Sequence, residues 1–521
     1  MILISSAAYV IGEFQAELGK IPPCFLPLGN KKLLEHQVSV LHTKYPNEVI
    51  VVSLPETYPI SEAEQSLIET LGIAYILVPE DFSLAESIAY AINVNNYLAE
   101  DQIIRIMYGD TLIHDLPEQH VGHDILGVAH SNDGYSWKIE KESQDSLIWC
   151  GFFSFSSKPL LLRCLALNRR DFIAAVESYR QQIEMQLCHF EYWFDLGHVN
   201  TYFRSRALIT TQRAFNELRI ENGVVHKTGS PARKIQAEGL WFKNIPSYLR
   251  IFTPQLIDHY VDEHEASHYE LEYLPHIPLN ELFVHGKNTA VEWNGLFGLI
   301  RNFVRKATVE LDDIEKQKIE SDFSNLIREK TFTRLNQYAS DMQIDLDQPM
   351  LYQQQLLPSL NQICCECLDR LALLPSHYGI LHGDLCFSNI LYDSRAFQVK
   401  VIDPRGMNTH GEFTIYGDQK YDLAKLTHSV IGLYDHIIAG RYNLFEDSQT
   451  GSVELKFDID QRILDIQDNF KQFEFIHDLK IQQIMPLVIL LFISMLPLHA
   501  DRPDRQKAML ANALRLYSLY F

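Results

Sequence analysis

The sequence predicts an α/β protein with more than one domain. A doubly wound, mostly parallel sheet is expected in the N-terminal part and an α+β arrangement in the C-terminal part. The length of 521 residues exceeds one typical domain, and a hydrophobic content of 46% is ample for sizeable cores. Apolar strand patterns alternate with helical patterns over the first 120 residues. This alternation is typical of a parallel sheet covered by helices.

The elements of the N-terminal part can be placed in order. Strands are expected at 2–4, 48–54, 73–78 and 102–108, and helices at 32–45, 61–71 and 83–97. Ser61 and Glu64 form the pattern of a capping box at the start of the second helix. Ligands of such sheets bind at the carboxyl ends of strands, and Asp110 follows the last of these strands.

The C-terminal part opens with a β-hairpin, because Asn222-Gly223 between two apolar runs is a strong hairpin signal. The following elements are expected in order: a helix at 234–242, a strand at 269–274, mostly helix at 294–330, strands at 390–392 and 399–402, and a helix opening at 416–426. The remainder of the chain is expected to be mostly helical.

Two motifs flank the strand pair near residue 395. His382-Gly383-Asp384 and Asn389 precede it, and Asp403 ends it within Ile402-Asp403-Pro404-Arg405-Gly406. A hairpin between them would bring Asn389 and Asp403 to one edge of the sheet. Phosphoryl transfer from ATP needs a carboxylate for the hydroxyl proton, and an amide oxygen with a second carboxylate for Mg²⁺. The alternative is an ordinary turn followed by an ordinary strand-end aspartate.

These motifs resemble the catalytic core of the aminoglycoside phosphotransferase and choline kinase group, which are small-molecule relatives of protein kinases. The resemblance implies a bilobal protein-kinase-like domain over 206–521, with a small lobe at about 206–275 and a large lobe at about 276–521. It implies that Asp384 is the catalytic base and that Asn389 and Asp403 bind Mg²⁺. The sequence lacks the Ala-Pro-Glu segment of protein kinases after Asp403.

The same resemblance implies a nucleotide site for ATP or another nucleoside triphosphate. Lys227 would pair with the phosphates, and Glu238 would pair with Lys227. Adenine would bind backbone groups of the segment between the lobes, at Glu272, Tyr273 and Leu274. The loop at 211–216 would cover the nucleotide, with Arg213 as a phosphate contact. The alternative is an exposed Lys227 at a strand end and a solvated Glu238.

Fewer residues indicate where the acceptor binds. Arg405 either favours an anionic acceptor or holds its loop through a salt bridge. Asp418 is expected near the substrate mouth, and Asp422 is expected to be buried and to brace the catalytic loop. Residues 328–335 either contact substrate or form a surface helix.

Three segments of the N-terminal part carry a second resemblance. They are the strand at 2–6, the run Phe25-Leu26-Pro27-Leu28-Gly29, and Gly109-Asp110-Thr111. With the later Trp193-Phe194-Asp195-Leu196-Gly197, they resemble the nucleotidyltransferases that make sugar nucleotides. This resemblance covers about 1–205 and implies that Asp110 and Asp195 bind Mg²⁺ between a nucleotide and the phosphate of a second substrate.

The loop that would bind phosphate departs from that family. Residues 5–12 contain a single glycine, the family's arginine is absent, and only the displaced Lys20 offers a charge. Glycine-rich loops cradle phosphates through backbone N–H groups, and this loop is poor in glycine. Three interpretations remain open: a divergent nucleotidyltransferase, a nucleotide or sugar-phosphate binder with other metal-dependent chemistry such as hydrolysis, and a scaffold.

Charge and cysteine content bear on the binding partners and the cellular compartment of the protein. The net charge of −22 argues against non-specific binding to nucleic acid or anionic membranes. The eight cysteines lack disulfide-like spacing, which favours a reducing cytosol, and those at 364–367 fit a helix core better than a metal site. The sequence start lacks a signal-peptide pattern, and the apolar run at 485–498 is shorter than a membrane span. A cytoplasmic protein without membrane insertion is expected, and its oligomeric state is left open.

Together the two resemblances predict an enzyme that phosphorylates a sugar, polyol or amino alcohol with ATP and Mg²⁺. Nucleotidyl transfer onto the product would follow, as in the synthesis of precursors for bacterial capsules and other surface polysaccharides. In one alternative only the kinase is active, and the N-terminal domain is a metal-dependent hydrolase or a nucleotide-sugar-binding scaffold. In another, the N-terminal domain carries the essential chemistry and the kinase regulates it. The non-catalytic alternative is a nucleotide-binding scaffold throughout.

Overall fold

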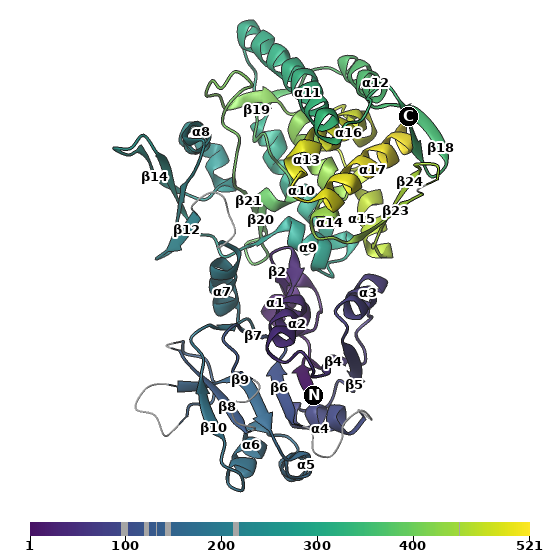
Figure 1. Cartoon of the computed structure of the whole chain (residues 1–521). Coiled ribbons are helices and arrows are strands. Elements are labelled where there is room, and N and C mark those ends of the chain that lie inside the picture. The colour runs from purple at the N-terminus through teal and green to yellow at the C-terminus, as the bar shows by residue number, and fades with distance from the viewer. Residues whose placement is uncertain (95–102, 119–123, 132, 141–146, 212–217, 448) are drawn as a thin grey trace. The chain divides into compact units, whose positions relative to one another are not determined.

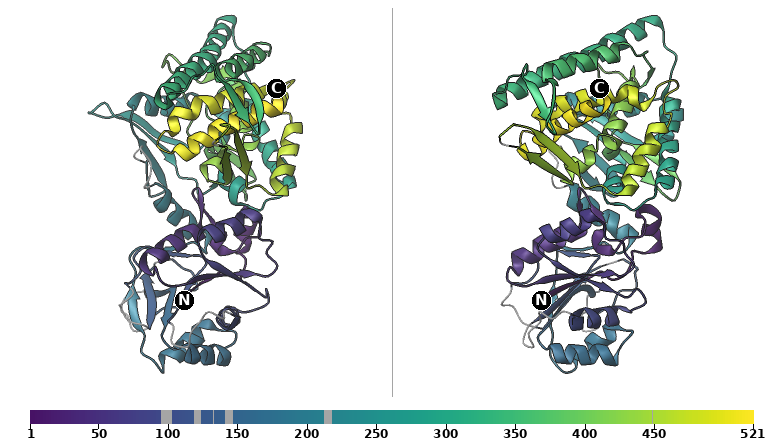
Figure 2. Two further views of the ribbon diagram at one scale, coloured as in Figure 1. Left: turned by 45° about the vertical axis from the view of Figure 1, so that its right-hand side comes forward. Right: turned by 90° about the vertical axis from the view of Figure 1, so that its right-hand side faces the viewer.

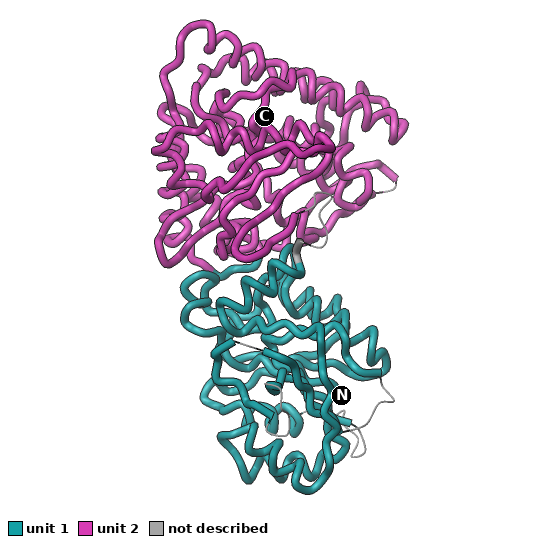
Figure 3. Tube along the Cα trace, turned by 90° about the vertical axis from the view of Figure 1, so that its left-hand side faces the viewer, with its two compact units in different colours: residues 1–212, 285–287 teal, residues 213–284, 288–521 magenta. Residues whose placement is uncertain are grey.

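The computed structural model describes the chain apart from residues 95–102, 119–123, 132, 141–146, 212–217 and 448. The chain forms two compact units (Figure 3). Unit 1 contains residues 1–212 and 285–287, and unit 2 contains residues 213–284 and 288–521. The predicted boundary after residue 205 falls within helix α7 (Val199–Thr211).

Unit 1 is built on a seven-stranded sheet with the order β10-β8-β9-β6-β1-β4-β5 (Figure 1). Its strands are β1 (Ile2–Ser5), β4 (Ile50–Pro55), β5 (Ala74–Val78), β6 (Ile104–Tyr108), β8 (Ile125–His130), β9 (Leu147–Phe155) and β10 (Gln186–His189). The central β1 is parallel to β4 and β6, and only β9 runs antiparallel to its neighbours. The predicted mostly parallel sheet is confirmed.

Helices alternate with these strands along the chain, as the sequence pattern predicts. They are α1 (Gly12–Leu18), α2 (Leu33–Lys44), α3 (Glu62–Thr70), α4 (Leu84–Val94), α5 (Lys158–Leu167), α6 (Phe172–Arg180) and α7. Buried residues of α4, α5 and α6 form one core with the sheet, in which Phe153 contacts Phe172 edge to face. The predicted capping box is present: Ser61 Oγ accepts from the Glu64 N–H, and the Glu64 carboxylate accepts from the Ser61 N–H.

Gln37 on α2 holds the turn between β6 and β7 (Thr111–Ile113). Its side-chain amide donates to the carbonyl oxygens of Tyr108 (3.0 Å) and Thr111 (2.7 Å), on either side of Asp110. Gln37 is fully buried, so water does not replace these bonds. A polar residue in an apolar helix pattern thus fixes the backbone that carries Asp110.

Replacing Gln37 by leucine should destabilise unit 1 by about 1–3 kcal/mol, because buried carbonyl oxygens lose their donor. Faster hydrogen exchange in peptides spanning β6 and β7, measured by mass spectrometry, would reveal the effect. Gln65→Ala, on the exposed face of α3, is the control and should leave exchange there unchanged. Equal exchange in both variants would contradict the assigned role of Gln37.

The N-terminal lobe of unit 2 is an antiparallel sheet with the order β12-β13-β15-β14. Its strands are β12 (Leu218–Glu221), β13 (Val224–Thr228), β14 (Leu256–Val261) and β15 (Ser267–Glu272), and helix α8 (Ala232–Asn244) packs against them. Asn222 and Gly223 adopt φ values of 50° and 79° between β12 and β13. Positive φ at both turn residues is the type I′ geometry, so the predicted hairpin is confirmed.

The second lobe is mainly helical. Its helices are α9 (Leu279–His285), α10 (Ala290–Ala307), α11 (Asp313–Met342), α12 (Leu360–Ala372), α13 (Lys420–Val430), α14 (Tyr434–Ile438), α15 (Gln461–Gln472), α16 (Ile481–Met495) and α17 (Pro503–Tyr520). The long α11 packs against α16 (Figure 2). The predicted strand pair is present as β20 (Ile390–Asp393) and β21 (Gln398–Val401), joined at its edge by β16 (Ile277–Pro278).

Two features of this lobe differ from the expected helices. Residues 416–418, expected to open a helix, form strand β22 (Tyr416–Asp418) beside β19 (Tyr378–Ile380). A four-stranded sheet also stands within the largely helical C-terminal region. It contains β17 (Pro349–Tyr352), β18 (Gln355–Ser359), β23 (Tyr442–Glu446) and β24 (Val453–Phe457). Short strands with few alternating apolar positions leave a weak sequence signal.

The most apolar segment is Ile481–His499, and by length and composition alone it could cross a membrane. In the structure 78% of its apolar window is buried inside the protein. The predicted buried helix is therefore confirmed as the core of this lobe. All eight cysteines are free, and Cys364 and Cys367 lie buried on α12, as expected for core residues.

Candidate functional site

The catalytic loop predicted in unit 2 joins β19 to β20 and is held by buried polar groups. The His382 Nε2–H donates to the Ile402 carbonyl oxygen (2.9 Å), and Nδ1 accepts from the Asp384 N–H (3.2 Å). Burial lowers the pKa of His382 to about 4, so the ring is neutral. The backbone N–H groups of His382 and Gly383 donate to the carboxylate of Asp422 (2.8 and 2.7 Å), which confirms the predicted brace.

Asp384 is held on both sides by neighbouring side chains. Lys425 Nζ lies 2.9 Å from its Oδ1, and the Asn389 amide donates to its backbone carbonyl (2.9 Å) and its Oδ2 (3.2 Å). Burial by itself would raise the pKa of Asp384, but the ion pair with Lys425 outweighs it and holds the pKa well below its ordinary value. The side chain remains 44% exposed, so an ionised carboxylate faces outward from the loop.

Lys425 was not identified from the sequence. It lies on α13, and no motif links this helix to Asp384. A lysine one turn after Asp422 on an apolar helix was the available signal, but such lysines are commonly solvated.

Lys227 on β13 joins three elements of unit 2. Its Nζ lies 2.7 Å from Glu238 Oε2 on α8 and 2.9 Å from Asp403 Oδ1 after β21. Tyr269 on β15 donates to the same Glu238 oxygen (2.8 Å). Burial opposes the charge on Lys227, but the two carboxylates outweigh it and raise its pKa. Lys227 and Glu238 are 5% and 2% exposed, so neither is the solvated surface residue of the alternative interpretation.

The strand pair brings Asn389 and Asp403 to one edge, as predicted. The Ile402 N–H donates to the Asn389 carbonyl oxygen (3.0 Å), so the two residues lie at the same end of β20 and β21. Asp403 is 44% exposed and adopts φ 57°, a strained region for a residue other than glycine that is common at functional sites. Carboxylate and amide oxygens are hard donors, so this pair fits Mg²⁺.

The segment between the lobes follows β15. The Tyr273 N–H donates to the Gly223 carbonyl oxygen (2.8 Å), and the Leu274 carbonyl accepts from the His276 N–H (2.9 Å). The Glu272 N–H donates to the Gln255 carbonyl (3.0 Å). These bonds fix the path of the three predicted hinge residues. The predicted phosphate contact Arg213, within the covering loop, lies outside the described residues.

The two predicted substrate residues line the same pocket but have different partners. Arg405 donates to the Gly383 carbonyl oxygen (2.7 Å), and its guanidinium carbon lies 4.4 Å from the centre of the Tyr421 ring. Asp418 is buried, and its carboxylate lies 3.2 Å from Lys420 Nζ. Arg405 therefore faces the catalytic loop, whereas the carboxylate of Asp418 is occupied by an internal ion pair.

The predicted metal residues of unit 1 lie side by side. Asp110 follows β6, and Asp195 ends β11 (Trp193–Asp195), which pairs with β7 so that Asp195 stands opposite Thr111. Burial, with a further contribution from the Asp195 charge, raises the pKa of Asp110 to about 6. A Cβ at Gly197 would lie 2.3 Å from Asp110 Oδ2, which explains why glycine is needed beside the pair. Two close carboxylates can hold a divalent cation.

The loop after β1 differs from a phosphate cradle in its contacts. The Ser6 N–H donates to Ser53 Oγ (3.1 Å). Lys20 pairs with Glu80 (3.0 Å) and lies 4.0 Å from the centre of the Tyr9 ring. The positive charge of Lys20, which was expected near this loop, is therefore paired with a carboxylate of the same unit.

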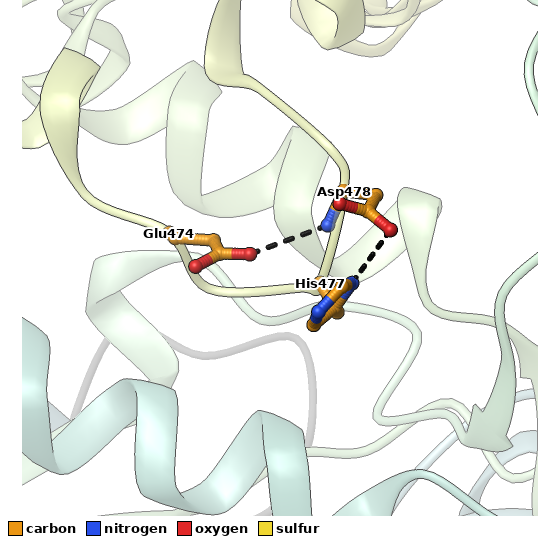
Figure 4. Close-up of side chains that lie close together, drawn as sticks. All are labelled: Glu474, His477 and Asp478. Atoms are coloured by element: carbon orange, nitrogen blue, oxygen red, sulfur yellow. Dashed lines mark hydrogen bonds and ion pairs between the residues drawn. The ribbon is translucent and has the colours of Figure 1, made fainter.

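A third cluster of polar side chains lies on the loop after α15. Glu474, His477 and Asp478 are exposed, with ligand atoms within 4.8 Å of one another. Glu474 accepts from the Asp478 N–H (3.3 Å), and His477 Nδ1 lies 2.7 Å from an Asp478 oxygen (Figure 4). Exposed clusters of this kind are common without an ion, so no role is assigned to it.

No protein-family model matches this chain, and no curated protein matches its sequence. Solved structures resemble parts of it. A nucleoside-diphosphate-sugar pyrophosphorylase from Vibrio cholerae RC9 is 16% identical over 40% of this chain and 99% of that protein, with a TM-score of 0.34. A choline/ethanolamine kinase family protein from Mesorhizobium loti is 11% identical over 62% of this chain and 94% of that protein, with a TM-score of 0.33.

A thermostable mutant of the aminoglycoside phosphotransferase APH(4)-Ia, in its apo form, is 12% identical. That match covers 58% of this chain and 89% of that protein, with a TM-score of 0.35. At these identities the matched structures concern the fold alone.

Replacing Asp110 by asparagine should raise the thermal midpoint of unit 1 by a few degrees at pH 7 without divalent cations. The folded pKa of about 6 lies above the unfolded value, so the folded unit binds the proton more tightly. The stabilisation is therefore present at low pH and is lost as pH rises through about 6. Mg²⁺ should stabilise the natural protein but not this variant.

Calorimetry across pH, with and without Mg²⁺, measures both effects. Asp81→Asn, at an exposed position of the same unit, is the matched control and should change neither. An equal response to Mg²⁺ in the natural protein and in Asp110→Asn would show that Asp110 is not a ligand.

Replacing Gly406 by alanine should separate the Asp403 loop from α8. Gly406 adopts φ 66°, and a Cβ there would lie 2.0 Å from the Ala237 carbonyl oxygen, next to Glu238. We expect a loss of several kcal/mol in unfolding free energy, measured with urea. Gly440→Ala has a similar φ of 71° with open space around it and should lose only about 1 kcal/mol. Similar losses in the two variants would rule out the proposed clash.

Proposed function

We propose that unit 2 transfers the terminal phosphoryl group of ATP, or of another nucleoside triphosphate, to a hydroxyl group of a small molecule. The observation that carries this proposal is the convergence of Lys227, Glu238 and Asp403. The neighbouring elements β13 and α8 and the loop after β21, which is distant in the sequence, meet at one buried ammonium group, with Asp403 left open to a ligand. A pairing that served only stability would not require an exposed, strained carboxylate.

The residues of the site would have separate roles in phosphoryl transfer. Lys227 would bind the nucleotide phosphates, and Glu238 would keep its ammonium group in position. Asn389 and Asp403 would hold Mg²⁺, which neutralises developing phosphate charge when bound. Backbone groups of Glu272, Tyr273 and Leu274 would bind the base.

Asp384 would accept the proton of the attacking hydroxyl. Its low pKa makes it a weak base in the resting protein, so orientation of the hydroxyl is its main contribution. This agrees with a loose transition state, in which little charge develops on the attacking oxygen before the phosphoryl group leaves. Lys425 and Asn389 would set the direction of the carboxylate.

For unit 1 we propose nucleotidyl transfer onto the phosphorylated product, with Asp110 and Asp195 as Mg²⁺ ligands. The adjacent carboxylates favour metal-dependent chemistry at phosphorus over a purely structural unit. In the loop after β1 the Ser6 N–H is bonded to Ser53, and Lys20 nearby in the sequence is paired with Glu80. These existing contacts favour the second candidate, a metal-dependent hydrolase or a nucleotide-sugar binder. A cytoplasmic role in making surface-polysaccharide precursors fits the first candidate.

Phosphorus NMR distinguishes these candidates. The protein is supplied with ATP, Mg²⁺ and an acceptor, and then with CTP, UTP or GTP. A nucleotide diphosphate conjugate supports coupled nucleotidyl transfer, whereas a phosphorylated product that goes no further supports the second candidate. Asp110→Ala should leave the kinase step intact, and loss of both steps would show that the two units depend on each other.

Replacing Asp384 by asparagine should lower the rate of phosphoryl transfer by roughly 10²–10⁴-fold. Nucleotide affinity should stay within a few-fold, because Lys227, Asn389 and Asp403 remain. ATP consumption and nucleotide binding by calorimetry measure the two quantities separately. Asp468→Asn, at an exposed position of α15, is the control. Full activity of Asp384→Asn would remove this residue from the mechanism.

A further inference from the structure

We infer that the acceptor carries an anionic group, a phosphate or a carboxylate, and that Lys330, Arg334 and Arg405 bind it. The inference rests on the proposed kinase function and names the substrate class for that site. The three cations come from two segments, α11 and the loop after β21. The guanidinium carbon of Arg405 lies 4.4 Å from the centre of the Tyr421 ring on α13, and the charges of Lys330 and Arg334 interact with the same tyrosine.

The helical repeat of α11 explains how two of them reach this place. Phe323 and Leu326 of α11 line a pocket together with Arg405 and Tyr421. Lys330 follows Leu326 by four residues and Arg334 by eight, so both continue the same face of the helix. Of the two interpretations of residues 328–335, this face supports substrate contact.

Within the part of the chain that the structure describes, no carboxylate lies at ion-pairing distance from Lys330, Arg334 or Arg405. Arg334 donates to the Ser494 carbonyl oxygen (3.1 Å), and Arg405 donates to that of Gly383 (2.7 Å). Carbonyl groups orient a guanidinium without neutralising it. Asp322 and Asp418 also line the pocket, but Asp322 lies 3.7 Å from His410 and Asp418 lies 3.2 Å from Lys420, so their partners are groups other than Arg405.

The titration of neighbouring groups reflects the charge of the three cations. Burial alone would raise the pKa of Tyr421, but Arg405, Lys330 and Lys425 outweigh burial and lower it to about 7. The Tyr421 ring raises the pKa of Lys330, yet burial and the other cations lower it to about 8. Two carboxylates act on this cluster. Asp384, which faces Tyr421, is paired with Lys425. Asp422, which acts on Arg405, accepts from the backbone N–H groups of His382 and Gly383. A bound anion would offset the charge of the three cations.

The cluster lies on the acceptor side of the reacting groups. Lys425 interacts with both Tyr421 and Asp384, so it links the cluster to the proposed base. Lys227 and Asp403, the proposed nucleotide side, do not belong to the cluster. An acceptor whose anion rests on Lys330 and Arg334 would extend its hydroxyl group towards Asp384.

The test uses matched acceptors with the full-length protein, ATP and Mg²⁺. Glycerol is compared with glycerate and glycerol phosphate, and glucose with gluconate and glucose phosphate. We expect the charged members to be phosphorylated with a kcat/KM at least about tenfold higher, as suits a charge-assisted hydrogen bond. The better of the carboxylate and phosphate members identifies the anion.

Lys330→Gln and Arg334→Gln should each raise the KM of the charged acceptor by roughly tenfold, with the KM of ATP nearly unchanged. Lys318→Gln, at an exposed position of the same helix, is the matched control and should change neither. Preference for neutral acceptors, or equal KM values in all variants, would overturn the inference while the kinase function stands. A parallel rise in the KM of ATP would also overturn it, because the cluster would then serve the nucleotide.

A second measurement does not depend on catalysis. Inorganic phosphate is titrated against the protein while tyrosine ionisation is followed by ultraviolet difference absorbance, with Tyr421→Phe as the reference. Phosphate in the pocket should raise the pKa of Tyr421, and the Lys330→Gln variant should bind it more weakly. Absence of ATP turnover with every acceptor would count against the kinase function alone. Absence of any phosphate effect on Tyr421 would count against the anion site.

Discussion

The buried ammonium group of Lys227 is the interaction on which unit 2 depends. It lies within 3 Å of carboxylates from α8 and from the loop after β21, so the sheet, the helix and this loop have one common point. A buried cation with two anionic partners fixes geometry more than it adds stability, because desolvation offsets much of the Coulomb attraction. Removing one partner leaves an uncompensated charge, so all three positions are tied to one another. The close packing of Gly406 against Ala237 has the same effect on the backbone.

A second set of polar contacts positions Asp384 independently of Lys227. Neutral His382, the carboxylate of Asp422 and the amide of Asn389 form hydrogen bonds to the loop that carries Asp384. Lys425 forms an ion pair with the Asp384 carboxylate. These groups are buried or nearly so, and each has a specific partner, as buried polar groups require. The loop is therefore arranged before any substrate binds. Preorganisation of this kind removes the cost of orienting the groups during the reaction.

The candidate sites of the two units differ in the charged side chains that they contain. In unit 2 the charges of Lys330, Arg334 and Arg405 act on Tyr421, although the whole chain has a net charge of −22. In unit 1 the carboxylates of Asp110 and Asp195 lie close together, and His198 Nδ1 lies 2.8 Å from Asp195. The anionic product proposed for unit 2 and the metal site proposed for unit 1 would be chemically compatible, since a divalent cation between carboxylates attracts phosphate.

The sequence by itself determined the fold class, the hairpin at Asn222-Gly223, the capping box at Ser61 and the position of Asn389 and Asp403 at one end of the strand pair. These features depend on local periodicity, turn chemistry and short motifs, which neighbouring residues encode. The sheet of β17, β18, β23 and β24 was not predicted, because short strands distant in the chain leave little periodic signal. The pairing of Lys425 with Asp384, the burial of Asp418 and the cluster around Tyr421 were decided by tertiary structure alone. Each depends on which faces of separate helices meet, and that is settled by packing across the whole lobe rather than by any one segment.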